Sequence, residues 1–330
     1  MLTEFALIDR VRKRIAHRNH VVLGIGDDAA IVRVPDKQEL AITMDTLHSG
    51  VHFPPETLPY DIGWKTLAVN LSDLAAMGAK PSWCTLSLSL PHSNVYWLDA
   101  FLDGFFAVAD AWQLALVGGD TTCSALSTTV TAMGIIPYGK ALRRSGAHIG
   151  DEIWVTGCPG EAAAALWLWR HKKLCIAETA PQSHCETVRT RLLRPVPRIA
   201  EGVGLRNLAS AAIDISDGLI ADLGHICSQS GVGAEIDVEA LPFTSAHMLG
   251  VSPQQVASWQ LCGGDDYELC FTAPAVNHTA ITALFAQLAT KVTPIGRITS
   301  HAGIDVSTQN GTPWDGQTAG YTHFSTPILS

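Results

Sequence analysis

The sequence has no basic block and no apolar run long enough to span a bilayer. Its 330 residues carry 22 Lys and Arg against 31 Asp and Glu, which gives a formal net charge of −9. A surface of this sign repels nucleic-acid phosphates, and charges interrupt every apolar stretch before the roughly 20 residues that a bilayer requires. We therefore expect neither nucleic acid nor membrane as a partner. The opening MLTEFALIDRVRKRIAH also lacks the apolar core of a signal peptide, so we expect a cytoplasmic protein.

Paired cysteine motifs and the common nucleotide motifs are missing as well. The eight cysteines show no CxxC spacing: Cys84, Cys123, Cys158, Cys175, Cys185, Cys227, Cys262 and Cys270. Zinc sites and disulfide frameworks depend on such spacing, so we expect reduced, mostly buried thiols. GIIPYGKA at 134–141 has the spacing of a P-loop but ends in Ala141, where Ser or Thr belongs. We predict neither a zinc site nor a P-loop.

Apolar periodicity predicts strands that alternate with helices. In WCTLSLSLP the Cys and Leu residues share one face, as in a half-buried strand. Further strands are expected at 39–45, 127–137, 151–157 and 267–274. Helices are expected at 59–78, after a Ser93 cap, at 160–173, and at 216–231 with Ser216 and Asp217 at the start. This order predicts the α/β class with mixed sheets.

The composition changes near PYGKALRRSGAHIGD, residues 137–151, where small and basic residues connect two expected strands. A chain of this length with 47% hydrophobic residues can fill two ordinary cores. We therefore place a domain boundary here and expect domains at 1–137 and 138–330.

Aspartates recur where apolar strands end or helices begin. They are Asp28, Asp45, Asp73, Asp120, Asp214, Asp217, Asp265 and Asp266. Adjacent carboxylates such as Asp27 and Asp28 repel each other unless water or a cation compensates. A single Asp is equally well explained as a turn or cap residue, but hard oxygen ligands in this number are what Mg²⁺ requires. We predict that Asp28 binds metal and that Asp27 accepts backbone hydrogen bonds.

Glycines flank three of these acidic motifs, GIGDD, VGGDTT and CGGDDYE. Glycine lets backbone N–H groups approach phosphate oxygens closely. Because Mg²⁺ commonly bridges carboxylates to substrate phosphates, the motifs indicate a polyphosphate ligand, with ATP as the obvious candidate.

Seven motifs occur in the order GIGDDAA, ITMDTLHSGVHF, KTLAVNLSDLAAMGAKP, GGDTT, RSGAHIGD, IDISDGL and GGDDYEL. Through them the chain resembles the bacterial thiamine-monophosphate kinases, a family of the aminoimidazole ribonucleotide synthetase-like proteins. The resemblance implies direct, Mg²⁺-assisted transfer from ATP to thiamine monophosphate, which gives thiamine diphosphate without a phosphoenzyme. It also implies a two-domain α/β (α+β type) fold with mixed sheets flanked by helices. The N-terminal domain would bind metal and ATP and form the barrel of a homodimer, and the C-terminal domain would complete the site.

The resemblance also assigns individual residues. The implied metal ligands are Asp28, Thr43, Met44, Asp45, Asp73, Asp120, Asp214 and Asp217; the implied ATP contacts are Gly119, Asp120, Arg144 and Ser216; and the implied thiamine monophosphate contacts are His52, Asp265 and Tyr321. Met44 stands where the family commonly has Thr, so a metal contact there would come from its backbone carbonyl. Asp265 is one methylene shorter than the usual Glu. No general base is expected, because a phosphate monoester with a second pKa near ~6 is already largely ionised at neutral pH.

Several alternatives remain open from the sequence. His52 is also explained as a turn residue, and Trp314 and Tyr321 as aromatic cover for the core rather than a face for the thiazolium. A sister enzyme such as a formylglycinamidine ribonucleotide cyclo-ligase would share the metal motifs. A protein that binds thiamine phosphate or nucleotide without turnover is the remaining possibility.

Overall fold

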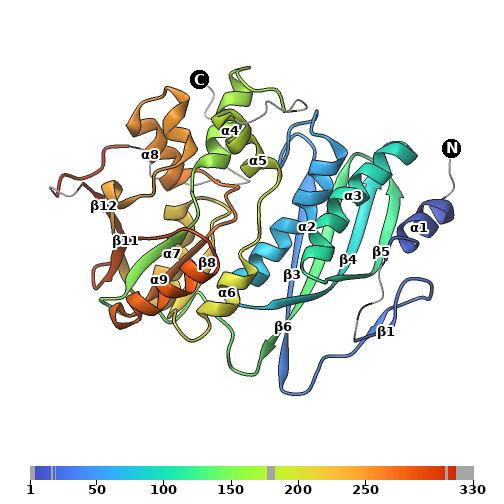
Figure 1. Cartoon of the computed structure of the whole chain (residues 1–330), viewed down its shortest axis with the longest axis horizontal. Helices are drawn as coiled ribbons and strands as arrows, with labels where there is room; N and C mark the ends of the chain where they lie inside the picture. Colours follow the sequence, from blue (N-terminus) through green and yellow to red (C-terminus); the bar gives the residue numbers. More distant parts are fainter. Residues whose placement is uncertain (1–3, 16–17, 19, 177–182, 309–310, 317–330) are drawn as a thin grey trace. The chain divides into compact units, whose positions relative to one another are not determined.

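The structure, a computed structural model, describes residues 4–15, 18, 20–176, 183–308 and 311–316. These residues fall into two compact units (Figure 1). The first unit is drawn from Met1–Ala141, Cys175–Thr179 and Leu193–Arg206, and the second from Leu142–Leu174, Ala180–Leu192 and Asn207–Ser330. Within the described residues, no helix is long and apolar enough to cross a bilayer.

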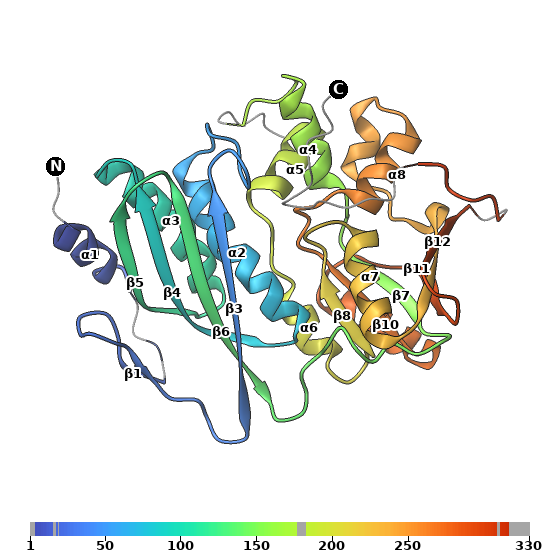
Figure 2. The same cartoon turned by 180° about the vertical axis from the view of Figure 1, so that it is seen from behind.

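The first unit contains a four-stranded sheet with two long helices along one face (Figure 2). Its elements are α1 (Glu4–Arg12), β1 (Val21–Leu23), β2 (Ile31–Val32), β3 (Gln38–His48), α2 (Pro59–Ala76), β4 (Lys80–Leu90), α3 (Val95–Ala111), β5 (Ala115–Cys123), β6 (Ser127–Pro137) and α6 (Ile199–Leu205). The sheet order is β3-β6-β4-β5; β4 and β5 are parallel, and the other neighbours are antiparallel. α1 contacts β5 at the edge of this sheet. β1 and β2 form a separate hairpin-like pair.

The predicted alternation in β4 is confirmed. Cys84, Leu86, Leu88 and Leu90 are buried, whereas the residues between them are more exposed. A strand with one face on the core and one toward solvent shows this period of two. The alternation therefore fixes which face of β4 meets the helices.

α2 and α3 pack so closely that their backbones touch at two glycines. A Cβ atom on Gly63 would lie 1.9 Å from the Phe101 carbonyl oxygen, and one on Gly104 would lie 1.9 Å from the Tyr60 carbonyl oxygen. Only glycine allows this approach. The pair sets the position of α2, which carries two residues of the candidate site, Asn70 and Asp73.

The start of α3 differs by one residue from the sequence prediction. Asn94, not Ser93, is the N-cap, and its side-chain oxygen accepts hydrogen bonds from the backbone N–H groups of Tyr96 (3.0 Å) and Trp97 (3.2 Å). Both residue types cap helices well, so the pattern alone could not choose between them. The Ser93 prediction is wrong because Asn94 is the residue placed to reach the first free donors.

The second unit is built around a six-stranded mixed sheet. Its elements are β7 (Glu152–Thr156), α4 (Glu161–Arg170), α5 (His184–Leu193), β8 (Ala211–Asp214), α7 (Leu219–Ser230), β9 (Gly233–Asp237), η1 (Val238–Ala240), η2 (Ser245–Leu249), α8 (Pro253–Cys262), β10 (Leu269–Ala273), η3 (Ala275–Asn277), α9 (His278–Gln287), β11 (Val292–Thr299) and β12 (Ile304–Ser307). The order is β12-β9-β11-β7-β10-β8, in which only β12 and β9 are parallel. The prediction of mixed sheets flanked by helices is therefore confirmed.

All eight cysteines are unbonded, as expected, but the prediction that most are buried is wrong. Cys84, Cys227 and Cys270 are buried, whereas Cys123 and Cys175 are exposed. Trp314 packs against the apolar core of the second unit, which is the core role left open from the sequence.

Candidate nucleotide and metal site

The structure divides the predicted site residues between the two units. Asp28 (between β1 and β2), Thr43, Met44 and Asp45 (β3), His52 (the turn after β3), Asp73 (α2), and Gly119 and Asp120 (β5) belong to the first unit. Arg144, Asp214, Ser216, Asp217 and Asp265 belong to the second. Tyr321 lies outside the described residues. Each unit therefore holds one group of candidate residues.

Three of the first group come together where β3 meets α2. The Thr43 hydroxyl donates a short hydrogen bond to Asp73, and the backbone N–H of Asp45 donates to the Asn70 side-chain oxygen at 3.0 Å. Burial, together with the negative charge of Asp73, raises the pKa of Asp45 to about 6. The fold thus places two mutually repelling carboxylates side by side.

Asp28 and Asp120 are exposed, and a local hydrogen bond fixes the backbone at each. The Asp27 carboxylate accepts the backbone N–H of Asp28 at 2.9 Å, which confirms the predicted role of Asp27. The Asp120 carboxylate accepts the N–H of Thr121 at 2.9 Å. Gly119 precedes it with φ +155, and a Cβ there would lie 1.9 Å from the Leu86 carbonyl oxygen. The second glycine of VGGDTT is therefore required by close contact with β4.

His52 and Met44 are placed differently from these carboxylates. The His52 ring nitrogen Nδ1 accepts the backbone N–H of His48 at 3.0 Å, and the buried Lys65 ammonium donates to the His52 carbonyl at 3.1 Å. His52 therefore stabilises the turn after β3, which is the role that the sequence had left open for it. The Met44 side chain is 64% exposed on β3.

The donors in the first unit fit a hard cation. Across the residues that the structure describes, no three His, Cys, Asp or Glu side chains gather into one ligand set. Asp45 and Asp73, with the Thr43 hydroxyl, instead supply a few hard oxygens and a concentrated negative charge. Mg²⁺ keeps several of its own waters and is usually bound through one or two carboxylates, so this sparse set suits it.

In the second unit, the IDISDG turn and the GGDDYE loop form one hydrogen-bonded structure. The Asp265 N–H donates to the Ser216 carbonyl (2.9 Å), and the Tyr267 N–H donates to the Ile215 carbonyl (2.8 Å). Asp265 and Tyr267 both have positive φ, and the Tyr267 hydroxyl donates to the Asp265 carboxylate at 3.1 Å. Two motifs about 50 residues apart in the sequence thus present Ser216, Asp217 and Asp265 on one scaffold.

Asp222 holds the turn from inside and was missed by the sequence reading. Its carboxylate oxygen Oδ2 accepts the backbone N–H groups of Ser216 (3.0 Å), Asp217 (3.1 Å) and Gly218 (3.1 Å). Burial raises its pKa to about 6 despite these bonds. The prediction that Ser216 and Asp217 cap the helix is wrong, because α7 starts at Leu219 and Asp222 reaches back to the turn. The only sequence signal was an Asp one turn into the helix.

Asp266 is buried and serves the fold. Its carboxylate accepts the N–H groups of Gly160 (2.7 Å) and Ala162 (3.4 Å) at the start of α4. Burial raises its pKa well above the usual value for Asp. Of the two adjacent aspartates in GGDDYE, only Asp265 remains a candidate ligand.

The loop that carries Arg144 is fastened to the end of α7. The Ser230 hydroxyl donates to the Arg144 carbonyl at 3.2 Å and accepts the N–H groups of Gly146 and Ala147, both at 3.1 Å. The Arg144 side chain is exposed. Asp214 is 4% exposed at the end of β8, directly before the turn. Ser230 therefore links the arginine loop to the helix that follows the IDISDG turn.

Comparison with known proteins gives matches over nearly the whole chain. Residues 26–136 match the AIR synthase related protein, N-terminal domain, and residues 148–308 match the corresponding C-terminal domain. The thiamine-monophosphate kinase of Salmonella typhimurium is 47% identical over 98% of this chain and 99% of its own length.

Solved structures agree with these matches. The crystal structure of thiamine-monophosphate kinase from Stenotrophomonas maltophilia has a TM-score of 0.88 and 52% identity, over 94% of this chain and 98% of that chain. AaThiL complexed with AMPPCP and TMP has a TM-score of 0.75 and 32% identity, over 97% of both chains. The predicted two-domain fold is thereby confirmed, and the chain belongs to the thiamine-monophosphate kinase family of the AIR synthase-related proteins.

Proposed function

We propose that this chain phosphorylates thiamine monophosphate to thiamine diphosphate, with ATP as the donor, by direct in-line transfer assisted by Mg²⁺ in the cytoplasm. The observation that carries the proposal is similarity over nearly the full length to kinases of this name, together with a 32% identical structure that binds AMPPCP and TMP. The reaction is the last step of thiamine diphosphate biosynthesis. A sister activity such as ribonucleotide cyclisation has no comparable support.

A cavity in the first unit supports the placement of ATP. It has a volume of about 70 Å³, and Gly118, Gly119, Asp120 and Thr121 line one part of it. The rest of its wall is apolar: Ile8, Val11, Ile25, Leu86, Leu88, Leu90, Leu98 and Leu116. An apolar cavity beside a glycine-carboxylate motif suits a nucleotide, whose base is flat and weakly polar and whose phosphates are charged. We place the base there, with Arg144 and Ser216 as further ATP contacts.

Bringing the two substrates together requires charge compensation. One pair of like charges at 4 Å costs about 4 kcal/mol at an effective dielectric constant of ~20. Bound Mg²⁺ would offset this repulsion and align the transferring group. The residues proposed to hold it are Asp28, Thr43, the Met44 carbonyl, Asp45, Asp73, Asp120, Asp214 and Asp217. The pairing of Asp45 with Asp73 supports this assignment, because a cation relieves their repulsion.

For thiamine monophosphate we propose His52, Asp265 and Tyr321 as contacts. The hydrogen bond from Tyr267 to Asp265 supports the second of these, because it fixes a carboxylate that is shorter than the family's usual Glu. No residue is needed as a general base, because the acceptor phosphate is already ionised at neutral pH. The protein's own side chains bind, orient and balance charge.

We also propose a homodimer formed through residues 1–137. β3 is an edge strand, and on it Leu40, Ile42 and Met44 are 38%, 63% and 64% exposed. A long edge strand with apolar side chains on its open face is a ready pairing surface. Ile42→Asp should convert the dimer to a monomer in sedimentation velocity, and a wild-type chain that sediments as a monomer at micromolar concentration would refute this proposal.

The activity is tested by phosphoryl transfer. Purified protein with Mg²⁺ and γ-labelled ATP should pass label to thiamine monophosphate, with formylglycinamidine ribonucleotide as the control acceptor. Release of ADP and phosphate with the ribonucleotide alone would favour the cyclo-ligase. Tight binding of ATP and thiamine monophosphate without transfer would instead identify a non-catalytic binding protein.

Replacing Asp222 tests whether the IDISDG turn of the second unit must be held in place for ATP binding. Asp222→Ala removes the acceptor for three N–H groups, so Ser216 and Asp217 lose their fixed positions. We expect the KM for ATP to rise about tenfold or more, with Asp222→Asn intermediate because it keeps one side-chain oxygen. Steady-state kinetics at varied ATP measure this. An unchanged KM in a folded Asp222→Ala enzyme would mean that the turn does not depend on this carboxylate.

A further inference from the structure

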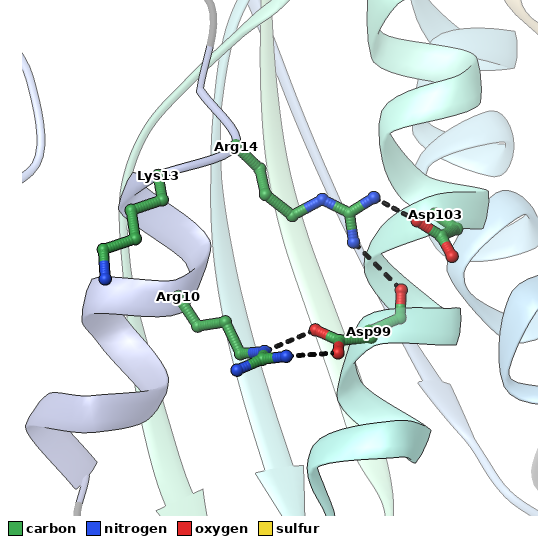
Figure 3. A pocket seen from close by; sticks show the side chains of 5 residues that line it. All are labelled: Arg10, Lys13, Arg14, Asp99 and Asp103. Carbon is green, nitrogen blue, oxygen red and sulfur yellow. Dashed lines mark hydrogen bonds and ion pairs between the residues drawn. The ribbon is translucent and has the colours of Figure 1, made fainter.

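A row of ion pairs fastens Arg10 of α1, and Arg14 and Arg18 beyond its end, to α3 about 90 residues later in the sequence. Arg10 forms two hydrogen bonds with the Asp99 carboxylate, both at 2.6 Å. Arg14 bonds the Asp103 carboxylate and donates to the Asp99 carbonyl at 3.0 Å, and Arg18 pairs with Asp110 at 2.5 Å. Figure 3 shows Arg10 and Arg14 reaching toward α3, whereas Lys13 points away from both carboxylates. We call these six residues, Arg10, Arg14, Arg18, Asp99, Asp103 and Asp110, the clamp.

The clamp holds α1 in a position where its apolar side chains line the cavity beside Asp120. Ile8 and Val11 of α1 line this cavity together with the leucines of β4 and Leu98 of α3. The C-terminal end of α1 also touches the GIGDD loop, since a Cβ on Gly26 would lie 3.2 Å from the Arg12 guanidinium. The same short helix therefore meets the cavity on one side and the Asp28 loop at its end.

The cavity is too small for a purine as it stands. Its volume is about 70 Å³, whereas an apolar cavity of about 150 Å³ holds a single benzene ring. The floor consists of β4 and β5, which are tied into the sheet. In contrast, α1 is tied to α3 by the Arg10–Asp99 pair and, just beyond its end, by the Arg14 and Arg18 pairs, whose side chains are partly exposed to solvent. Exposed ion pairs are weak individually, so α1 is the wall that can yield.

We propose that α1 is the adjustable wall of the nucleotide-base site, and that the clamp positions it so that Ile8 and Val11 close on the base. This inference rests on the proposed function, because it presupposes ATP in the cavity. The clamp residues are positioning residues, since none of them lines the cavity. They act on ATP affinity through the placement of α1 and leave the transferring phosphate untouched.

The Arg10–Asp99 pair of the clamp keeps its charges at neutral pH. The hydrogen bond from Arg10 holds the pKa of Asp99 below its usual value, so the carboxylate stays ionised. Arg10 is always charged at such pH values. This pair is therefore not a pH switch, and its strength depends on geometry and on salt.

The test is a charge swap. Arg10→Asp places two carboxylates face to face and should raise the KM for ATP about three- to tenfold, while kcat and the KM for thiamine monophosphate stay within about twofold. Asp99→Arg should do the same. The double variant Arg10→Asp with Asp99→Arg restores opposite charges and should return the KM for ATP to near wild type. A merely structural defect in the single variants would instead change kcat and the KM for thiamine monophosphate together with the KM for ATP.

Two further variants separate the wall from the clamp and provide a control. Val11→Phe fills the cavity and should raise the KM for ATP more than Arg10→Asp does. Arg297→Asp breaks a comparable exposed pair with Glu235, at 3.0 Å in the second unit, and should leave the KM unchanged. If wild type never transfers phosphate, the proposed function fails. If wild type is active and the folded swap variants keep its KM for ATP, the clamp proposal is overturned.

Discussion

Replacing Asp45 by Asn is expected to reduce phosphoryl transfer by at least about a thousandfold while making the metal-free protein more stable. The loss of activity follows from removing one charged oxygen ligand from the proposed Mg²⁺ site, since the charge stabilisation it supplies is worth several kcal/mol. The gain in stability follows because Asp45 sits partly buried beside Asp73, which raises its pKa to about 6. Asn fits the same space without the charge.

The sign and pH window of the stability effect follow from the pKa shift. A carboxyl group whose pKa is raised on folding binds its proton more tightly in the folded state, so its contribution to stability falls as pH rises from about 4 to about 6. Asn removes that loss. In EDTA, the variant should match wild type near pH 4 and exceed it by about 1–3 kcal/mol at pH 7.

Thermal unfolding with and without Mg²⁺ measures both effects together. Mg²⁺ should raise the Tm of wild type and have little effect on Asp45→Asn. Asp305→Asn, at an exposed position on β12, is the matched control and should change neither activity nor the response to Mg²⁺. An active Asp45→Asn enzyme would show that Asp45 is not a ligand in the proposed metal site.

Replacing Gly63 or Gly104 by Ala is expected to cause the largest losses of stability among the substitutions considered, and Gly63→Ala is the clearer case. The added Cβ would lie 1.9 Å from the Phe101 carbonyl oxygen, which belongs to the backbone of α3 and cannot rotate away. The two helices would have to separate, at a cost of about 3 kcal/mol or more. Gly104→Ala should be equally severe because its Cβ meets the Tyr60 carbonyl oxygen.

Gly224→Ala is the control for intrinsic helix preference. Gly224 lies in α7, where a Cβ would come no closer than 4.0 Å to Ile304. This change should stabilise the chain by up to about 1 kcal/mol, because Ala is the better helix former. Urea unfolding of the three variants gives the comparison. A Gly63→Ala protein as stable as wild type would show that α2 and α3 can separate at little cost.

Local periodicity predicted five of the strands (β3, β4, β6, β7 and β10) and four of the helices (α2, α3, α4 and α7), which is fewer than half of those described. Where it succeeded, as over β4 and β6, the alternation reflects which side chains meet the core. The motifs also led to the family, since their order along the chain is itself specific. Helix caps were predicted less well. Ser93 was predicted as the cap of α3, where the structure has Asn94, and Ser216 was predicted to start a helix, where the Asp222 side chain instead accepts the Ser216 N–H. In both cases neighbouring polar residues compete for the same donors, and only the three-dimensional path of the chain decides.

Long-range partnerships could not be predicted from the sequence. Arg10 and Arg14 have helical spacing, but nothing in the sequence identifies Asp99 and Asp103 as their partners 89 residues away. Asp266 resembles Asp265 in every local respect, yet it is buried against the start of α4. The roles of Asp265 and Asp266 differ because their side chains point in different directions. The positive φ values in this loop change the side-chain direction from one residue to the next.

Because the cysteines differ in exposure, one of them can carry a fluorescent label that detects nucleotide binding. Burial raises the pKa of the Cys84 and Cys270 thiols, so they should resist alkylation, whereas Cys123 is exposed on β5 only three residues after Asp120. With the other exposed thiol removed as Cys175→Ser, a maleimide fluorophore should attach preferentially at Cys123. Its emission would then register the arrival of ATP, because Cys123 follows the proposed phosphate contacts Gly119 and Asp120 on the same strand.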